Sequence, residues 1–234
     1  MKDLIKLRFE NKYILSQSAY YRVVNSIKPI SIHDANSALG KTYKVRSLYY
    51  DNRDFSAYVE KINGINVRDK FRIRTYEIDE NKISKIKIEM KSRVDQLVYK
   101  ISNTISYKDF KLFERNKIFG NAKGLAVDLF LYNFFKFNLT PTTLVEYDRE
   151  AYFSKKDDVR FTFDHNIRYA FDKNILAPYN NFKSCYKNAI IFEIKSDKND
   201  IDWLSNIIRN HGLRSEPNSK YVKSVEHTIN NMWQ

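Results

Sequence analysis

Basic residues occupy every second position of the stretch 68–75, which reads RDKFRIRT. Successive side chains of a β-strand point to opposite faces. One face of a strand here would carry four cations, namely Arg68, Lys70, Arg72 and Arg74. The opposite face would carry Phe71 and Ile73 at its centre, so the stretch predicts a strand with one basic and one apolar face.

A neighbouring strand, at residues 85–93, repeats the pattern after a turn near residues 79–81. Its basic positions are Lys85, Lys87, Lys91 and Arg93. One such strand would fit the solvent face of an antiparallel sheet. Like charges opposed across neighbouring strands destabilise a sheet, however, and at least five strands of this chain show such a face. We therefore expect the basic faces to line a solvated lumen and the apolar faces to pack against helices outside it.

The rest of the chain alternates further strands with helices, which predicts the α+β class. The eight expected strands lie at residues 6–14, 42–51, 68–74, 85–93, 97–103, 143–153, 159–169 and 189–195. The expected helices lie at about residues 16–27, 54–61, 106–116, 123–137, 201–210 and 219–232. We expect one domain, residues 1–234, built as an eight-stranded β tunnel or barrel with a polar, basic lumen and helices packed outside.

The composition narrows the class of ligand. Among 234 residues there are only 5 glycines, and neither a G-x-x-x-x-G-K-[ST] loop nor a G-x-G-x-x-G turn occurs. The 41 Lys and Arg against 28 Asp and Glu give a net charge of +13, which implies an acidic partner: nucleic acid, an anionic membrane surface or a phosphate-rich molecule. Cations on inward faces favour a threaded phosphate chain, so we expect no nucleic-acid partner.

No segment indicates a secreted or membrane protein. No apolar run reaches the ~18–20 residues of a membrane span, and the N-terminus lacks the apolar region of a signal peptide. Cys185 is the only cysteine, so the chain can form neither an internal disulfide nor a cysteine-based metal site. We therefore expect a cytoplasmic protein without a membrane span, while the oligomeric state stays open.

Three glutamates lie among the cations on expected inward faces, namely Glu10, Glu89 and Glu193. Carboxylates in a phosphate site commonly hold a divalent cation, and oxygen ligands suit Mg²⁺ and Mn²⁺. We therefore expect Mn²⁺ or Mg²⁺ as the cofactor.

Eight short pieces of the chain, in order, resemble the VTC (vacuolar transporter chaperone) polyphosphate polymerase domain, a branch of the triphosphate tunnel metalloenzyme superfamily. The pieces are RFENKY (8–13), SLYYDN (47–52), RDKFRIRTY (68–76), EMKSR (89–93), EYDREAY (146–152), RFTFD (160–164), FEIK (192–195) and SKY (219–221). The resemblance implies an antiparallel tunnel of eight strands that binds ATP or triphosphate and polyphosphate. It also implies an enzyme, a phosphotransferase that moves the γ-phosphate of ATP onto a growing polyphosphate chain.

The resemblance further assigns roles to single residues. The implied phosphate ligands are Lys12, Arg72, Arg74, Lys91, Lys100, Arg149, Arg160 and Lys220. The implied catalytic residues are Arg72, Arg74, Lys91 and Glu193. Glu193 would hold the metal ion, with Glu10 and Glu89 as further candidate ligands. Periodicity leaves open which face of the strand at 143–153 points inward, so only the resemblance selects Arg149.

The chain departs from the wider superfamily at the first motif of the sequence. The superfamily often begins E-x-E-x-K, whereas Arg8, Glu10 and Lys12 occupy those positions here. This departure disfavours the thiamine-triphosphatase and class IV cyclase branch and favours the VTC branch. The chain shows neither the inositol-phosphate-sensing domain nor the membrane helices of eukaryotic relatives, so coupling to transport would need a separate membrane partner.

Other functions stay open on the sequence alone. A triphosphate hydrolase would use the same tunnel, with water in place of the acceptor phosphate. A non-catalytic module would bind polyphosphate without turnover, although retention of Glu193 argues against it. A nucleic-acid binder is disfavoured because no RNA- or DNA-binding motif occurs among the interleaved basic and aromatic residues.

Overall fold

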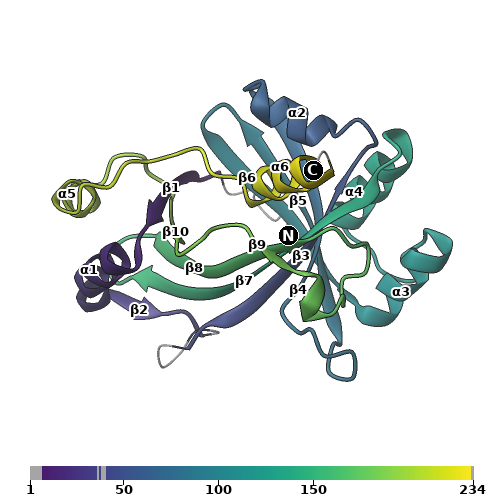
Figure 1. The fold of residues 1–234 in the computed structure, drawn as a ribbon, viewed down its shortest axis with the longest axis horizontal. Coiled ribbons are helices and arrows are strands. Elements are labelled where there is room, and N and C mark those ends of the chain that lie inside the picture. Colours follow the sequence, from purple (N-terminus) through teal and green to yellow (C-terminus); the bar gives the residue numbers. More distant parts are fainter. Residues whose placement is uncertain (1–6, 36, 38–40, 233–234) are drawn as a thin grey trace.

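The computed structural model describes residues 7–35, 37 and 41–232, which contain one strongly curved antiparallel sheet (Figure 1). Its main strands follow the order β1-β10-β8-β7-β3-β4-β5-β6. Their bounds are β1 Phe9–Leu15, β3 Tyr43–Asp51, β4 Val67–Thr75, β5 Lys85–Val94, β6 Leu97–Ser106, β7 Thr140–Ser154, β8 Val159–Ala170 and β10 Ile190–Ser196. Two short strands complete the sheet: β2 (Ser31–His33) pairs with β7, and β9 (Lys183–Ser184) pairs with β8.

The alternation of basic and apolar residues predicts all eight main strands correctly. Residue 6 of the first expected strand lies outside the described residues. The observed β6 ends at Ser106 rather than residue 103, and β7 begins at Thr140 rather than residue 143. The sequence does not predict β2 and β9, because two or three residues are too few to show a period.

In the described part of the chain, the two outermost strands are joined at one point, where the residue before β1 meets β6. Arg8 and Val98 form an isolated bridge, in which each N–H donates to the other residue's carbonyl oxygen at 2.9 and 3.0 Å. Along the rest of its length β1 pairs with β10 alone, through all seven of its residues. The expectation of a barrel is therefore too strong: the sheet curls but does not close, because twist makes its edge strands diverge from their one contact.

Four helices cover the convex face of the sheet. They are α1 (Gln17–Ile27), α3 (Tyr107–Asn116), α4 (Leu125–Lys136) and α5 (Asp202–Asn210). Under α3 and α4, Phe113 and Phe130 pack with Ile88 of β5, and under α1 and α5, Phe161 and Phe192 form the centre of a second core. The expectation of helices outside the apolar strand faces is confirmed for these four. No helix of the described chain is long and apolar enough to cross a membrane.

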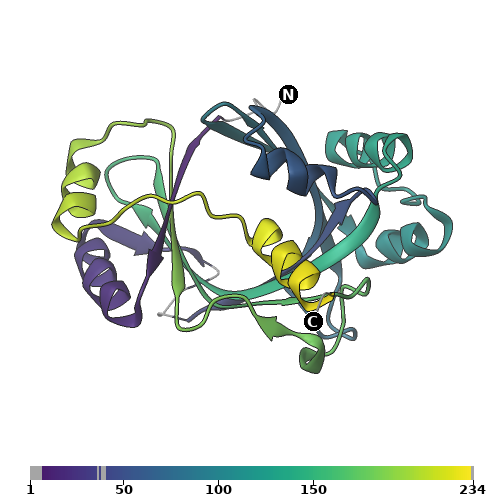
Figure 2. The same cartoon turned by 45° about the horizontal axis from the view of Figure 1, so that its top comes forward.

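The last helix, α6 (Lys220–Met232), lies on the concave side instead, next to α2 (Ser56–Ile62) (Figure 2). Its Tyr221 and Val225 are buried against a third core that includes Val45 of β3 and Val145 of β7. The inward positions at this end of the two strands are apolar rather than basic. A helix can therefore bury its apolar side there, and its first residue faces the basic part of the lumen.

Two polar residues around the end of β3 hold both inner helices. Asp51 Oδ1 accepts the backbone N–H of Ala57 at 3.1 Å, and its Oδ2 accepts the hydroxyl of Tyr221. Asn52 Oδ1 accepts the backbone N–H of Ser56 at 2.9 Å. Both residues thus accept backbone N–H groups in the first turn of α2, and Asp51 also ties α2 to the start of α6.

We expect Tyr221→Phe to lower the free energy of unfolding by about 1–3 kcal/mol, because the buried Asp51 carboxylate loses its hydroxyl donor. Urea denaturation followed by fluorescence measures this change. Tyr21→Phe removes a hydroxyl from a tyrosine that is 57% exposed and should change the same free energy little. Equal effects of the two substitutions would contradict the role given to the Asp51–Tyr221 contact.

Candidate functional site

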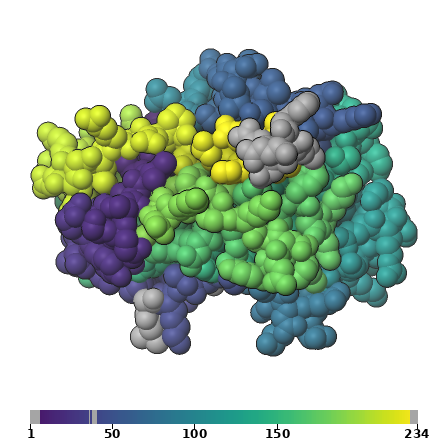
Figure 3. Space-filling model, viewed as in Figure 1, coloured from purple at the N-terminus to yellow at the C-terminus, as the bar shows by residue number. Residues whose placement is uncertain are grey.

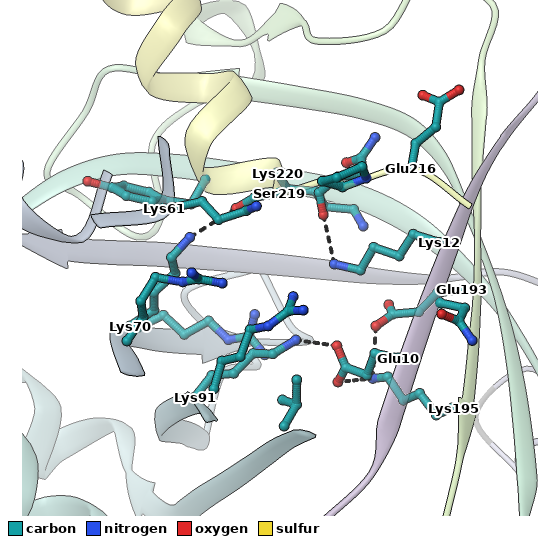
Figure 4. A pocket seen from close by; sticks show the side chains of 18 of the residues that line it. Glu10, Lys12, Lys61, Lys70, Lys91, Glu193, Lys195, Glu216, Ser219 and Lys220 are labelled. Atoms are coloured by element: carbon teal, nitrogen blue, oxygen red, sulfur yellow. Dashed lines mark hydrogen bonds and ion pairs between the residues drawn. The ribbon is translucent and has the colours of Figure 1, made fainter. Parts of the chain in front are cut away.

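A cavity of about 530 Å³ lies on the concave side of the sheet (Figure 4). Strands β1, β3, β4, β5, β6, β7 and β10 line it, together with the end of α2 and the start of α6. Among the described residues, its lining includes eleven basic side chains: Lys12, Lys61, Arg68, Lys70, Arg72, Arg74, Lys91, Arg93, Arg149, Lys195 and Lys220. Only four lining residues carry carboxylates: Glu10, Asp95, Glu193 and Glu216. The predicted basic lumen is therefore present.

The cavity is enclosed on one side by segments far apart in the chain. In the space-filling view, the yellow residues that lead into α6 lie between the blue residues around α2 and the green residues of the stretch that follows β8 (Figure 3). The segment between α5 and α6 crosses the concave side (Figure 2), and its residues 215–219 line the cavity. A ligand inside would thus contact both the strand faces and this crossing segment.

A buried glutamate holds two arginines of β4 in place. Glu89 of β5 lies opposite Arg72 in the strand register and accepts its Nε–H at 2.7 Å. It lies 3.5 Å from Arg74 and accepts from Lys100 Nζ at 2.9 Å. Burial alone would raise the pKa of Glu89, but Arg74, Arg72 and Lys100 hold it well below its usual range. Glu89 is fully buried and does not line the cavity itself, so it acts as a counter-ion that orients these cations.

A second buried carboxylate, Asp164 of β8, orients a cation pair from β7 and α6. Arg149 donates to it bidentately, Nε to Oδ1 at 2.6 Å and Nη2 to Oδ2 at 2.8 Å, and Lys220 Nζ lies 2.6 Å from Oδ2. Burial would raise the pKa of Asp164, but Arg149 and Lys220 lower it to about 2. Arg149 lines the cavity beside Tyr147, which decides the question that periodicity leaves open for this strand.

Two carboxylates face the cavity from the neighbouring strands β1 and β10 (Figure 4). Glu10 pairs with Lys91, and Lys195 Nζ lies 3.8 Å from Glu10 and 3.6 Å from Glu193. Burial would raise the pKa of Glu193, but Lys195, Lys12 and Lys91 hold it well below its usual range. The pKa of Glu10 is also lowered, because Lys91 and the other nearby lysines outweigh burial and the charge of Glu193. Both carboxyls are therefore ionised at neutral pH.

These two carboxylates fit a divalent cation that shares its ligands with phosphate. The described residues contain no group of three or more His, Cys, Asp or Glu side chains that could hold a metal ion. Mg²⁺ does not need such a group, since it is usually bound through one or two carboxylates plus substrate phosphates and water. Glu10 and Glu193 supply that number of carboxylates, whereas the oxygens of Glu89 are already occupied by three cations.

Sequence comparison identifies the family. The family model described as VTC domain matches residues 7–229. The chain belongs to the VTC domain family. No curated protein sequence matches it.

Solved structures share the fold of this VTC domain. A candidate adenylate cyclase from Bacillus halodurans aligns with a TM-score of 0.57 and 12% identity, over 92% of this chain and 96% of that chain. Two proteins from Pyrococcus horikoshii align with a TM-score of 0.50 each, at 13% and 15% identity, over 93% and 94% of this chain and 98% and 99% of theirs. The predicted family and the triphosphate tunnel fold are thereby confirmed.

The VTC domain brings six of the eight expected phosphate ligands to the cavity: Lys12, Arg72, Arg74, Lys91, Arg149 and Lys220. The other two do not line it. Lys100 pairs with Glu89, and Arg160 Nη2 donates to Asp34 at 2.8 Å and approaches the Tyr43 hydroxyl at 3.4 Å. Of the expected metal ligands, Glu193 and Glu10 line the cavity and Glu89 does not.

Sequence reasoning misses several lining residues of the VTC domain. Lys195 lies two positions after Glu193 on the same strand face, so alternation alone could have found it. Tyr49 accepts from Arg72 Nη1 at 3.1 Å, and its inward position follows from the pairing of β3 with β4. Lys61 comes from helix α2, and no strand pattern points to it.

Proposed function

We propose that this VTC domain is a metal-dependent polyphosphate polymerase that transfers the γ-phosphate of ATP to a growing polyphosphate chain. The main support for this proposal is the cavity, in which fixed cations surround two ionised carboxylates. Polyanionic phosphate chains match this lining, because arginine forks bind phosphate oxygens bidentately and lysines add point charges.

The cations are preorganised, which supports catalysis as well as binding. Glu89 holds Arg72 and Arg74, and Asp164 holds Arg149 and Lys220, so these side chains need little rearrangement when charge develops on the transferred group. Preorganised charges of this kind commonly supply the largest part of the rate enhancement in phosphoryl transfer.

Glu193 and Glu10 are the residues that would hold Mn²⁺ or Mg²⁺. A bound divalent cation would neutralise charge on the triphosphate and act as a Lewis acid at its oxygens. Divalent metals are general in the tunnel superfamily, and the carboxylate pair of this chain supports the same use here. Lys91 and Lys195 keep both carboxyls ionised before a metal binds.

The proposed reaction needs no nucleophile from the protein. A terminal oxygen of the polyphosphate chain forms a bond to the γ-phosphorus, and the bond between that phosphorus and the β–γ bridging oxygen breaks. The chain gains one phosphate and ADP leaves. Arg72, Arg74, Arg149, Lys12 and Lys220 would bind and orient the two polyanions, and the enclosing residues 215–219 would limit the access of water.

Incubation of the purified chain with ATP and Mn²⁺ tests the proposal, with polymer and free phosphate followed together. We expect polymer, and we expect a chelator to stop its formation. Free phosphate without polymer would show a triphosphate hydrolase instead, and neither product, with triphosphate still bound, would show a binding module. Polymer formation that persists in excess chelator would contradict the metal-dependent part.

A further inference from the structure

We propose that helix α4 (Leu125–Lys136) is an interface at which two copies of this chain pair, with their α4 helices antiparallel. The helix lies on the convex side of the sheet, at the opposite end of the molecule from α1 and α5 (Figure 1). None of its residues lines the cavity. The interface is therefore independent of the reaction proposed for the cavity.

Helix α4 is apolar on two opposite sides. On the side that packs on the sheet, Ala126 and Phe130 are fully buried in the core. On the other side Leu125 is 55% exposed, Tyr132 60% and Phe135 59%. Single exposed apolar residues are common on protein surfaces. A helix that is apolar on both sides is instead typical of one that is covered on both sides, so the outer side of α4 indicates a binding surface.

Five residues of the outer side share one face of the helix. Tyr132 is at the centre, and the others lie seven or four positions before it and three or four positions after it, which are spacings of a single helical face. These residues are Leu125, Asp128, Tyr132, Phe135 and Lys136. Lys136 Nζ lies 3.1 Å from the Tyr132 hydroxyl oxygen and 5.2 Å from the centre of its ring. The face thus carries three large apolar side chains and one charge of each sign.

The apolar area of this face suits a weak dimer. Aromatic side chains offer about 150–250 Å² each, so the exposed fractions of Leu125, Tyr132, Phe135 and the adjoining Phe137 amount to roughly 400 Å². Apolar patches of this size on a monomer often mark binding surfaces. Two copies joined here, with their flanking polar groups, would bury roughly 1,000 Å² in total, the lower end for a specific interface. We therefore expect a reversible dimer with a dissociation constant of about 1–100 μM.

The two charges of the face favour a second copy over other partners. Asp128 lies in the first turn of α4 and Lys136 in the last, and neither forms an ion pair within the described residues. In an antiparallel pair centred on Tyr132, Asp128 of each copy lies level with Lys136 of the other, so two opposite-charge contacts form together. An anionic membrane would attract Lys136 but repel Asp128, which lies only about 12 Å away along the helix.

Sedimentation velocity of the purified chain at about 1–200 μM tests the interface. We expect a monomer–dimer equilibrium in the wild type, and we expect Tyr132→Ser/Phe135→Ser to raise the dissociation constant about tenfold or more, because central aromatic residues carry most of the binding energy of an interface. The control Tyr21→Ser/Phe171→Ser also removes one tyrosine and one phenylalanine, each 57% exposed. It should leave the dissociation constant within about threefold of the wild type.

Exchanging the two charges tests the antiparallel arrangement. Asp128→Lys places like charges at both contacts and should weaken the dimer about tenfold or more. Asp128→Lys/Lys136→Asp forms the same contacts with exchanged signs and should restore the dissociation constant to within about threefold of the wild type. The exchanged charges oppose the helix dipole, so denaturant unfolding of each variant is measured as well to establish that the chain stays folded.

Three results would overturn the proposal. The first is a wild-type chain that stays monomeric at about 200 μM. The second is a dimer that Tyr132→Ser/Phe135→Ser does not weaken, and the third is a failure of the exchanged charges to restore the dimer that Asp128→Lys has lost. Vesicles of anionic phospholipid serve as a comparison. A monomer that binds them, and that loses this binding in Tyr132→Ser/Phe135→Ser, would show a membrane-binding surface in place of the dimer interface.

Discussion

Glu193→Gln is expected to lower the rate of polyphosphate synthesis by about 10²–10³-fold and to weaken its dependence on metal concentration. Glu193 is one of two ionised carboxylates that face both the cavity and its lysines. Glutamine keeps the shape of the side chain and removes the charge that a divalent cation requires. Burial lowers the pKa of Lys12 and of Lys195, and in the variant both lysines lose the carboxylate whose charge opposes that effect.

A matched substitution separates this role from a general change in charge. Glu216→Gln makes the same replacement at another lining glutamate, whose side chain points away from Glu10 and Glu193 (Figure 4). We expect its rate to stay within about threefold of the wild type. Full activity and an unchanged metal titration in Glu193→Gln would contradict the assigned role.

Asp164→Asn is expected to lower the free energy of unfolding by about 3–5 kcal/mol near neutral pH. Asp164 is fully buried, and it pairs with both Arg149 and Lys220. The substitution leaves two buried cations without their counter-ion. Chemical denaturation measures the loss, and Asp158→Asn, at a residue whose side chain is 45% exposed, is the control with little expected change.

The pH dependence of this loss has a definite sign. The pKa of Asp164 is about 2 in the folded chain and near 4 when unfolded, so its ionisation stabilises the fold above about pH 4. That contribution falls as the pH drops from about 4 towards 2, where the carboxyl becomes neutral like the asparagine. The difference between wild type and variant should therefore shrink in this range. A difference that stays constant with pH would contradict the buried ion pair.

Strand alternation predicts the wall of the tunnel because the side-chain period of a strand is fixed. The inward cations Arg68, Lys70, Arg72 and Arg74 follow from that period alone, and all four line the cavity. The same period cannot tell the two faces of β7 apart, since both carry charges. The structure selects the inward face, because Arg149 and Tyr147 line the cavity.

Features that depend on tertiary contacts could not be predicted from the sequence. Lys100 and Arg160 are cations that could bind phosphate. Each instead pairs with a carboxylate that does not line the cavity, namely Glu89 and Asp34. The single bridge between β1 and β6 depends on the accumulated twist of the sheet. The inner position of α6 depends on the apolar ends of β3 and β7, whose faces sequence reasoning leaves unassigned.

The stoichiometry of the reaction distinguishes a polyphosphate polymerase from a triphosphate hydrolase. Phosphorus NMR of the purified chain with ATP and Mn²⁺ distinguishes internal phosphates of a polymer from free phosphate, and ADP is measured in the same sample. We expect internal phosphate and ADP to rise in equal amounts, with no matching rise of free phosphate, and both to rise about 10²–10³-fold more slowly in Glu193→Gln. ADP that rises together with free phosphate, without an internal signal, would contradict the polymerase.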